Sequence, residues 1–243
     1  MARHLCRLQR ANRPELRTEV PGQTRKSQWR QLASAEYLGR TAVIALLGLS
    51  AGLVLFGFNL WIPTNLRKMG FTEADAILRN AALIGFPLTF VVAWMYGFWS
   101  SKKTIIVLAA LTAAALFGFV IAGDDILTHR GLLYLLLVIP IWGINSVVAV
   151  LSVYCVEVYP TRIRSRASGF FAAVSKAGGV LIIALVALGV APPSIASIAL
   201  IGAIPMALAV VAIALFGVET RKRRLEQIAP DKHLLGGPAR LPG

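Results

Sequence analysis

Length, composition and charge favour a membrane protein over a soluble one. The chain has 243 residues, of which 57% are hydrophobic and 15% charged, whereas a soluble domain carries about 25% charged residues. The net charge of +14 suggests nucleic acid as a partner, but the basic residues lie in the tails and between apolar runs, so we expect no nucleic-acid binding. Cys6 and Cys155 are far apart, and the three His form no cluster, so we expect no disulfide framework, metal site or cofactor.

Residues 1–40 are predicted to form a basic cytoplasmic segment. They hold nine Lys and Arg residues and show little apolar periodicity. Within this segment, Ser27–Leu38 (SQWRQLASAEYL) is compatible with a short interfacial helix and equally with a disordered lead-in.

Six apolar stretches between residues 41 and 218 are long enough to cross a bilayer, which takes about 20 residues. None carries an acidic residue in its middle, and none alternates polar with apolar residues as barrel strands do. We therefore predict an all-α membrane fold of six transmembrane helices, followed by a basic tail at 219–243. The stretches are Ala42–Ile62, Ile77–Phe98, Thr104–Ala122, Leu132–Val156, Ser168–Val190 and Ile195–Val218.

The distribution of Lys and Arg predicts the orientation of these helices. With the N-terminus in the cytoplasm, twenty of the 25 basic residues lie inside, four lie outside (Arg67, Lys68, Arg79 and Arg130), and Lys176 lies within a span. The positive-inside rule therefore places both termini in the cytoplasm. We expect a multi-pass protein of the plasma (inner) membrane, with lipid as one partner.

The stretch VEVYPTRIRSRASGF (Val156–Phe170) places four charges between the fourth and fifth apolar stretches. Pro160 cannot continue a helix, so we expect a turn, with Arg162, Arg164 and Arg166 in a tight basic loop. A carboxylate at a helix C-terminus is unfavourable against the helix dipole, so we expect Glu157 to bond a loop Arg or a backbone amide of the next helix. A simple stop signal would explain the three Arg residues but not Glu157 or Pro160.

This stretch resembles the E-x-x-P-T-x-x-R charge-relay loop between the tenth and eleventh helices of major facilitator superfamily transporters. Two further stretches resemble the same family: GVETRKRRLEQI (217–228) is similar to a sugar-porter ending, and GFNLWIPTNLRKMGF (57–71) to the outer end of the seventh helix in metabolite–proton symporters. The resemblance covers about residues 30–228. It implies a cytoplasmic gate or charge relay made of Glu157, Pro160, Thr161, Arg162, Arg164, Glu219, Lys102 and Lys103.

One turn departs from the family pattern. Where relatives carry a D-R-x-G-x-K turn between the second and third helices, this chain reads GFWSSKK, with Gly97 and Phe98 in place of the Asp and Arg. Lys102 and Lys103 remain. The gate in this half is therefore expected to be weaker, or to depend on Glu157 and Glu219 alone.

The family has twelve helices in two six-helix halves, with solute bound between them near the membrane midplane. The resemblance therefore implies the C-terminal half of a secondary transporter for a small organic solute, a sugar or organic acid, moved by proton-coupled alternating access. Its partner would be a missing or separate N-terminal half, or a second copy of the chain. The alternative is a non-transporting truncated paralogue that binds or regulates a full-length transporter. The chain shows no catalytic motif, so we expect no enzyme.

Polar and amphipathic residues within the spans are the candidates for the wall of the solute cavity. They are Asn59, Trp61, Trp142, Asn145 and Lys176. Trp142 and Asn145 lie three residues apart and so share one helix face. For Asn59 and Asn145, hydrogen bonding between helices is an equal alternative to solute contact. Lys176, about two turns into the fifth predicted helix, either binds a solute carboxylate or extends to the membrane surface. Since no span has an acid in its middle, a proton carrier is expected in the other half.

Overall fold

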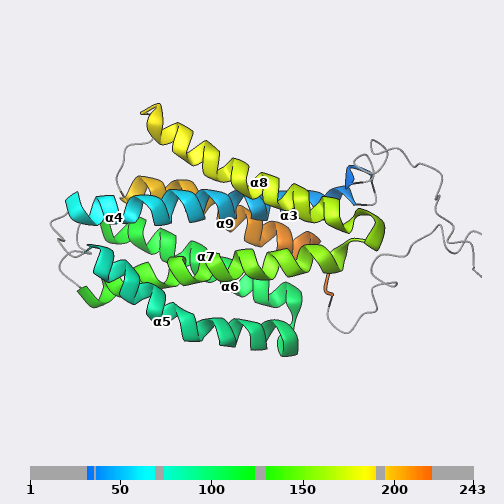
Figure 1. The fold of residues 1–243 in the computed structure, drawn as a ribbon, viewed down its shortest axis with the longest axis horizontal. Helices are drawn as coiled ribbons and strands as arrows, with labels where there is room; N and C mark the ends of the chain where they lie inside the picture. The colour runs from blue at the N-terminus through cyan, green and yellow to red at the C-terminus, as the bar shows by residue number, and fades with distance from the viewer. Residues whose placement is uncertain (1–31, 36, 69–73, 124–129, 190–194, 221–243) are drawn as a thin grey trace, which may run out of the picture.

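The computed structural model describes residues 32–35, 37–68, 74–123, 130–189 and 195–220, and the regular structure within these ranges is entirely helical (Figure 1). This confirms the predicted all-α fold. The proposed interfacial helix at Ser27–Leu38 lies largely outside the described residues, as does the tail beyond Thr220.

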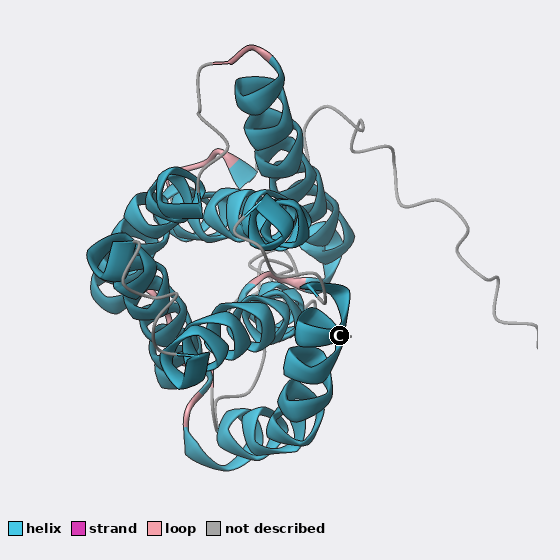
Figure 2. Cartoon of the chain, turned by 90° about the vertical axis from the view of Figure 1, so that its left-hand side faces the viewer, coloured by secondary structure: helices cyan, strands magenta, loops and turns pink. Residues whose placement is uncertain are grey.

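The helices run roughly side by side along the long axis of the molecule (Figures 1 and 2). In chain order they are α3 (Leu38–Gly52), η1 (Leu53–Phe58), α4 (Asn59–Lys68), α5 (Ala74–Trp94), η2 (Met95–Trp99), α6 (Ser101–Ala122), α7 (Arg130–Val158), α8 (Thr161–Ala187) and α9 (Ile195–Phe216). Both η1 and η2 are short π-helical turns that continue the helix before them.

Six helical segments of the described chain are long and apolar enough to cross a membrane, as predicted. They are Leu38–Lys68, Leu78–Trp99, Ser101–Ala122, Gly131–Val158, Ile163–Ala187 and Ala196–Phe216. The first of them combines α3, η1 and α4 in one continuous helix. The chain is therefore a multi-pass integral membrane protein.

Helices α3 and α8 cross in close contact, and glycines make this crossing possible. A Cβ atom on Gly52 would overlap the backbone oxygen of Ser175, and a Cβ on Gly178 would overlap the backbone oxygen of Leu49. Inside a bilayer, helices associate largely through such close backbone approach, because lipid leaves no hydrophobic driving force between them. Elsewhere, α6 packs against α7 and α9, and α5 packs against α7.

The predicted basic loop between the fourth and fifth spans is wrong. Helix α7 ends at Val158 and α8 begins at Thr161, so the backbones of Arg162, Arg164 and Arg166 belong to the first turns of α8. Pro160 is the N-cap, with φ −62° and ψ 154°, and its carbonyl accepts from the amides of Ile163 and Arg164 at 3.1 Å each. A proline has no N–H to lose at a helix start, which is why it separates the two helices with so short a connection.

Helix α6 also begins earlier than the apolar pattern predicts. Lys102 and Lys103 lie in its first turn, behind Ser100, whose Oγ caps the helix by accepting from the Lys103 amide at 3.1 Å. Polar residues in a helix end are invisible to a hydropathy pattern, and capping residues define the true start.

Candidate functional site

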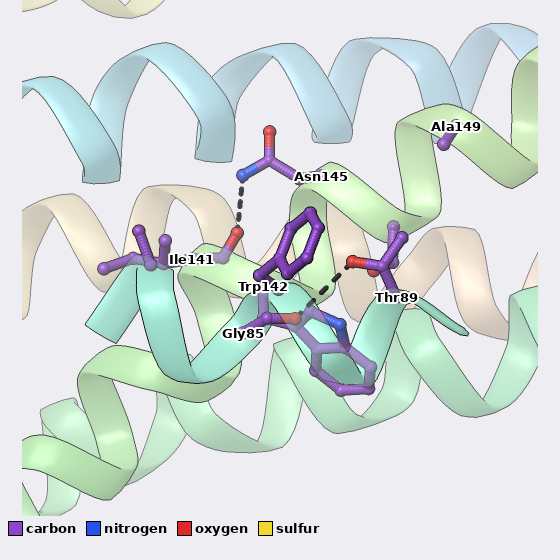
Figure 3. Close-up of a pocket in the computed structure, with 9 residues that line it drawn as sticks. Gly85, Thr89, Ile141, Trp142, Asn145 and Ala149 are labelled. Carbon is purple, nitrogen blue, oxygen red and sulfur yellow. Dashed lines mark hydrogen bonds between the residues drawn. The ribbon is translucent and has the colours of Figure 1, made fainter. Parts of the chain in front are cut away.

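A pocket with a volume of about 250 Å³ lies between α5 and α7 (Figure 3). Its wall is mainly apolar and aromatic, with a few polar groups, as is usual for small-molecule sites. The lining residues are Ala82, Gly85, Phe86, Thr89, Ile141, Trp142, Asn145, Ser146 and Ala149. Two of the five predicted cavity residues, Trp142 and Asn145, are among them.

Helix periodicity and one glycine bring Trp142 and Asn145 into this pocket. The two side chains share a face of α7, and Asn145 is exposed, with its Nδ2 donating to the Ile141 carbonyl at 2.7 Å. Opposite them, a Cβ on Gly85 would lie 3.1 Å from the Trp142 Cβ, so α5 approaches the indole closely (Figure 3). The spacing in the sequence anticipated the shared face but gave no sign of Gly85.

The indole of Trp142 carries an unused hydrogen-bond donor. Its Nε1 is buried and has no hydrogen-bond partner in the described part of the chain. An unsatisfied buried N–H costs about 1–3 kcal/mol, and a membrane interior offers little water to relieve it. A solute oxygen or ring nitrogen that accepts this hydrogen bond would gain that free energy.

Asn59 and Trp61 do not line this pocket but belong to α4. The Asn59 Oδ1 and the Trp61 Nε1 are also buried without a hydrogen-bond partner among the described residues. Hydrogen bonds between helices of the described chain therefore do not account for these two atoms.

Lys176 lies much deeper in its helix than the sequence suggested. Because α8 starts at Thr161 and not near Ser168, Lys176 is the sixteenth residue of the helix rather than two turns from its start. Its Nζ lies 4.8 Å from the centroid of the Phe56 ring.

Glu157, at the α7–α8 end of the bundle, is bonded by two hydroxyl groups. Its carboxylate accepts from the Tyr96 hydroxyl at 2.8 Å and from the Thr220 Oγ1 at 2.5 Å. The expected bond to a loop Arg or a backbone amide is therefore wrong. The reason is that the Arg residues are wound into α8, while η2 and the end of the chain after α9 bring hydroxyls to the carboxylate instead.

The segment Gly217–Thr220 is tied down by further bonds at the same end. Ser100 Oγ donates to the Glu219 carboxylate, and the Tyr154 hydroxyl both donates to the Val218 carbonyl at 2.7 Å and accepts from the Val218 amide at 2.8 Å. Together with the Thr220–Glu157 bond, these contacts connect the residues after α9 to α7 and to Ser100, which lies between η2 and α6. We call this set of contacts the C-terminal latch.

The predicted gate residues are thus only partly brought together. Glu157 and Glu219 belong to the latch, and Lys103 touches it through its backbone amide. Arg164 is half-buried, with a buried Nε that has no hydrogen-bond partner among the described residues, and Thr161 is exposed. The side chain of Arg162 lies outside the described residues. Sequence reasoning missed Tyr96, Ser100 and Tyr154, of which only Ser100 carried a signal, as a cap before an apolar run.

A second group of contacts joins the α7–α8 turn to α3. The Tyr159 hydroxyl and Thr41 Oγ1 are 2.9 Å apart, and Arg40 donates to the Val158 carbonyl at 3.4 Å. Burial raises the pKa of Tyr159 to about 12, against a smaller lowering by the Thr41 hydrogen bond. The phenol is therefore neutral at any physiological pH, and this contact does not titrate.

Two curated proteins are similar to this chain over most of its length. One is the "Putative niacin/nicotinamide transporter NiaP" of Bacillus subtilis (strain 168), 28% identical over 226 residues, which are 87% of this chain and 55% of that protein. The other is the "Inner membrane metabolite transport protein YdjE" of Escherichia coli (strain K12), 26% identical over 203 residues, 82% of this chain and 43% of that protein. This chain spans about half the length of both.

Both relatives are named as transporters and not as enzymes. The family whose pattern matches this chain is described as the Major Facilitator Superfamily, and the match runs from residue 5 to residue 182. Since that match covers most of the chain and the fold is six membrane-crossing helices, the chain belongs to the Major Facilitator Superfamily.

Proposed function

We propose that this chain forms one six-helix half of a secondary transporter for a small organic solute, with the α5–α7 pocket as part of the solute-binding wall. The observation that carries the proposal is Trp142. Its ring lines the pocket and supplies an aromatic surface, and its buried Nε1 is a donor that the described residues leave unpaired. The volume of about 250 Å³ fits a solute of metabolite size rather than a peptide.

The pocket wall favours a flat, partly apolar solute. Phe86 and Trp142 present aromatic surface, whereas Thr89, Asn145 and Ser146 are the polar lining residues. Such a wall suits a planar ring with one or two polar groups better than a sugar with many hydroxyls. The name of the relative NiaP points to the same kind of solute, so we favour an organic acid or its amide over a sugar.

A second six-helix unit is the partner in this proposal. Helix α5 and η2 expose an aromatic row spaced every four residues, Phe86, Phe90, Trp94 and Phe98, each more than 60% exposed. The first of these residues also lines the pocket, so the row extends the pocket wall along the bundle. A facing unit would cover the row and close the pocket, which is how two halves enclose a solute in alternating access.

In this arrangement the C-terminal latch is the cytoplasmic gate. Both chain termini face the cytoplasm, and the protein lies in the inner membrane of a bacterial-type cell. The excess of basic residues on that side supports this orientation. Proton coupling belongs to the proposal as well. Because the six spans carry no acid in their middle, the proton carrier is assigned to the facing unit.

Uptake by the host cell tests the proposal. The chromosomal copy is deleted or replaced by Trp142→Ala or Trp142→Phe, and uptake is followed for radiolabelled organic acids, amides and sugars. Deletion is expected to abolish uptake of one solute, Trp142→Ala to lower it by about tenfold or more, and Trp142→Phe, which keeps a ring but loses the donor, by about fivefold. Protein amounts in the membrane are measured in parallel.

A non-transporting role is the second candidate, favoured by the GFWSSKK turn that departs from the family pattern. If deletion leaves the uptake of every tested solute unchanged, the transport proposal is wrong. Capture of an intact family member by the tagged chain from the same membranes would then support the regulatory role.

A further inference from the structure

Lys176 is a charged residue at the middle of a membrane-crossing helix. The span is Ile163–Ala187, and its first turn carries Arg164 and Arg166, so Lys176 follows the last of these charges by ten positions and precedes the end of the span by eleven. At 1.5 Å per residue, its backbone is about 15 Å from Arg166 along the helix. Lys176 therefore lies at the middle of the apolar part of α8.

The ammonium group of Lys176 packs across to the first span. Its Nζ sits 4.8 Å from the centroid of the Phe56 ring, while the Lys176 side chain is exposed. Phe56 in turn packs on Gly179 of α8, where any Cβ would overlap the ring. Gly179 and Lys176 thus lie on the same turn of α8. The glycine leaves room for the Phe56 ring, and the ammonium group of the lysine lies over that ring.

The ring does not compensate the charge. A cation–π contact is worth about 0.5–2 kcal/mol, and a Lys at the centre of a membrane helix costs at least about 2.5 kcal/mol. Within the described part of the chain, no carboxylate lies within ion-pair distance of Lys176. Cations within membrane spans pair with an anion or line a water-filled path, and the exposed ammonium group of Lys176 has no anion beside it among the described residues.

The backbone that holds Phe56 is itself unusual. Phe56 lies inside η1 (Leu53–Phe58), a π-helical turn between α3 and α4, and such turns are frequently found at functional sites. The wider turn changes the direction of the side chains that follow it relative to a continuous α-helix. The π-helical turn in the first span therefore contains Phe56, the residue whose ring contacts the Lys176 ammonium group.

We propose that Lys176 is the carboxylate-binding residue of the solute path, resting on the Phe56 ring when no solute is bound. The ligand class is a small organic monocarboxylate. Its carboxylate would replace the weak cation–π contact with a charge-assisted hydrogen bond, which is about twice as strong as a neutral one. This inference rests on the proposed transport function and further specifies that the transported solute is negatively charged.

Equilibrium binding tests the inference with pairs of probes that differ in one group. Tritiated nicotinate and nicotinamide share a ring but carry a carboxylate or an amide, and benzoate and benzamide form a second pair. The protein is purified from its host membrane with any chain that stays bound, in nanodiscs of phosphatidylethanolamine and phosphatidylglycerol. Wild type is expected to bind at least one carboxylate about tenfold more tightly than its amide.

Lys176→Gln is expected to lower the carboxylate affinity by about tenfold and to leave the amide within about twofold, whereas Lys176→Arg keeps the preference for the carboxylate. Size-exclusion profiles establish that both variants are folded. Equal affinity for acid and amide in wild type, unchanged carboxylate affinity in Lys176→Gln, or no saturable binding of either carboxylate would overturn the inference. If amide binding still depends on Trp142 in that case, the proposed function survives and only the role of Lys176 fails.

Discussion

Replacing Gly52 with valine is expected to disrupt the α3–α8 crossing and to lower stability by about 3 kcal/mol or more. A Cβ at this position overlaps the backbone oxygen of Ser175 and lies close to the backbone of Gly179. No rotamer change relieves an overlap with backbone, so the two helices must move apart and lose the close approach on which membrane helix packing depends. The change is measured as the thermal unfolding midpoint of the purified protein in detergent.

Gly169→Val is the matched control for this substitution. It places the same side chain within α8, but no atom lies within 4 Å of the new Cβ, so only the small difference in helix propensity remains. The packing account would be contradicted if the two variants unfolded within about 2 °C of each other.

Glu157→Ala is expected to release the C-terminal latch. The substitution leaves the Tyr96 and Thr220 hydroxyls without their shared acceptor. Hydrogen bonds to a charged group contribute about 1.5–3 kcal/mol each, and the partial exposure of Glu157 reduces the combined loss of the two bonds to roughly 2–4 kcal/mol. Faster hydrogen exchange at the amides of residues 217–220, with reduced uptake, is the expected readout.

Glu157→Gln distinguishes a hydroxyl-bonded carboxylate from one paired with arginine. The glutamine oxygen still accepts from a hydroxyl, so exchange at residues 217–220 should stay much closer to wild type than in Glu157→Ala. If Gln were as disruptive as Ala, the negative charge itself would be what matters. The partner would then be a cation, as the sequence pattern had suggested, and the hydroxyl account would be wrong.

The six spans were predictable because a bilayer imposes long apolar runs whatever the details of packing. Their ends were not, because the first turns of α6 and α8 are polar and basic. That error carried over to Lys176, which is the sixteenth residue of α8 and not two turns from its start.

In the candidate site, too, some neighbours were predictable from the sequence and others were not. Trp142 and Asn145 were predictable as neighbours because one helix and a spacing of three bring them together. The partners of Glu157 were not, since Tyr96 and Thr220 are 61 and 63 residues away in the chain and meet it only through the packing of three elements. Local spacing thus predicts what one helix carries, and only the tertiary structure decides what faces it.

Solute protection of a cysteine at position 145 tests the central claim, that the α5–α7 pocket is part of a solute path. Asn145→Cys is made in a Cys6→Ser, Cys155→Ala background and labelled in membranes with a hydrophilic maleimide. Leu208→Cys, an exposed position of α9 outside the pocket, is the control. The account predicts that position 145 reacts, that position 208 does not, and that the solute identified by uptake slows labelling by about fivefold or more. An unreactive cysteine at position 145, or labelling that this solute leaves unchanged, would contradict it.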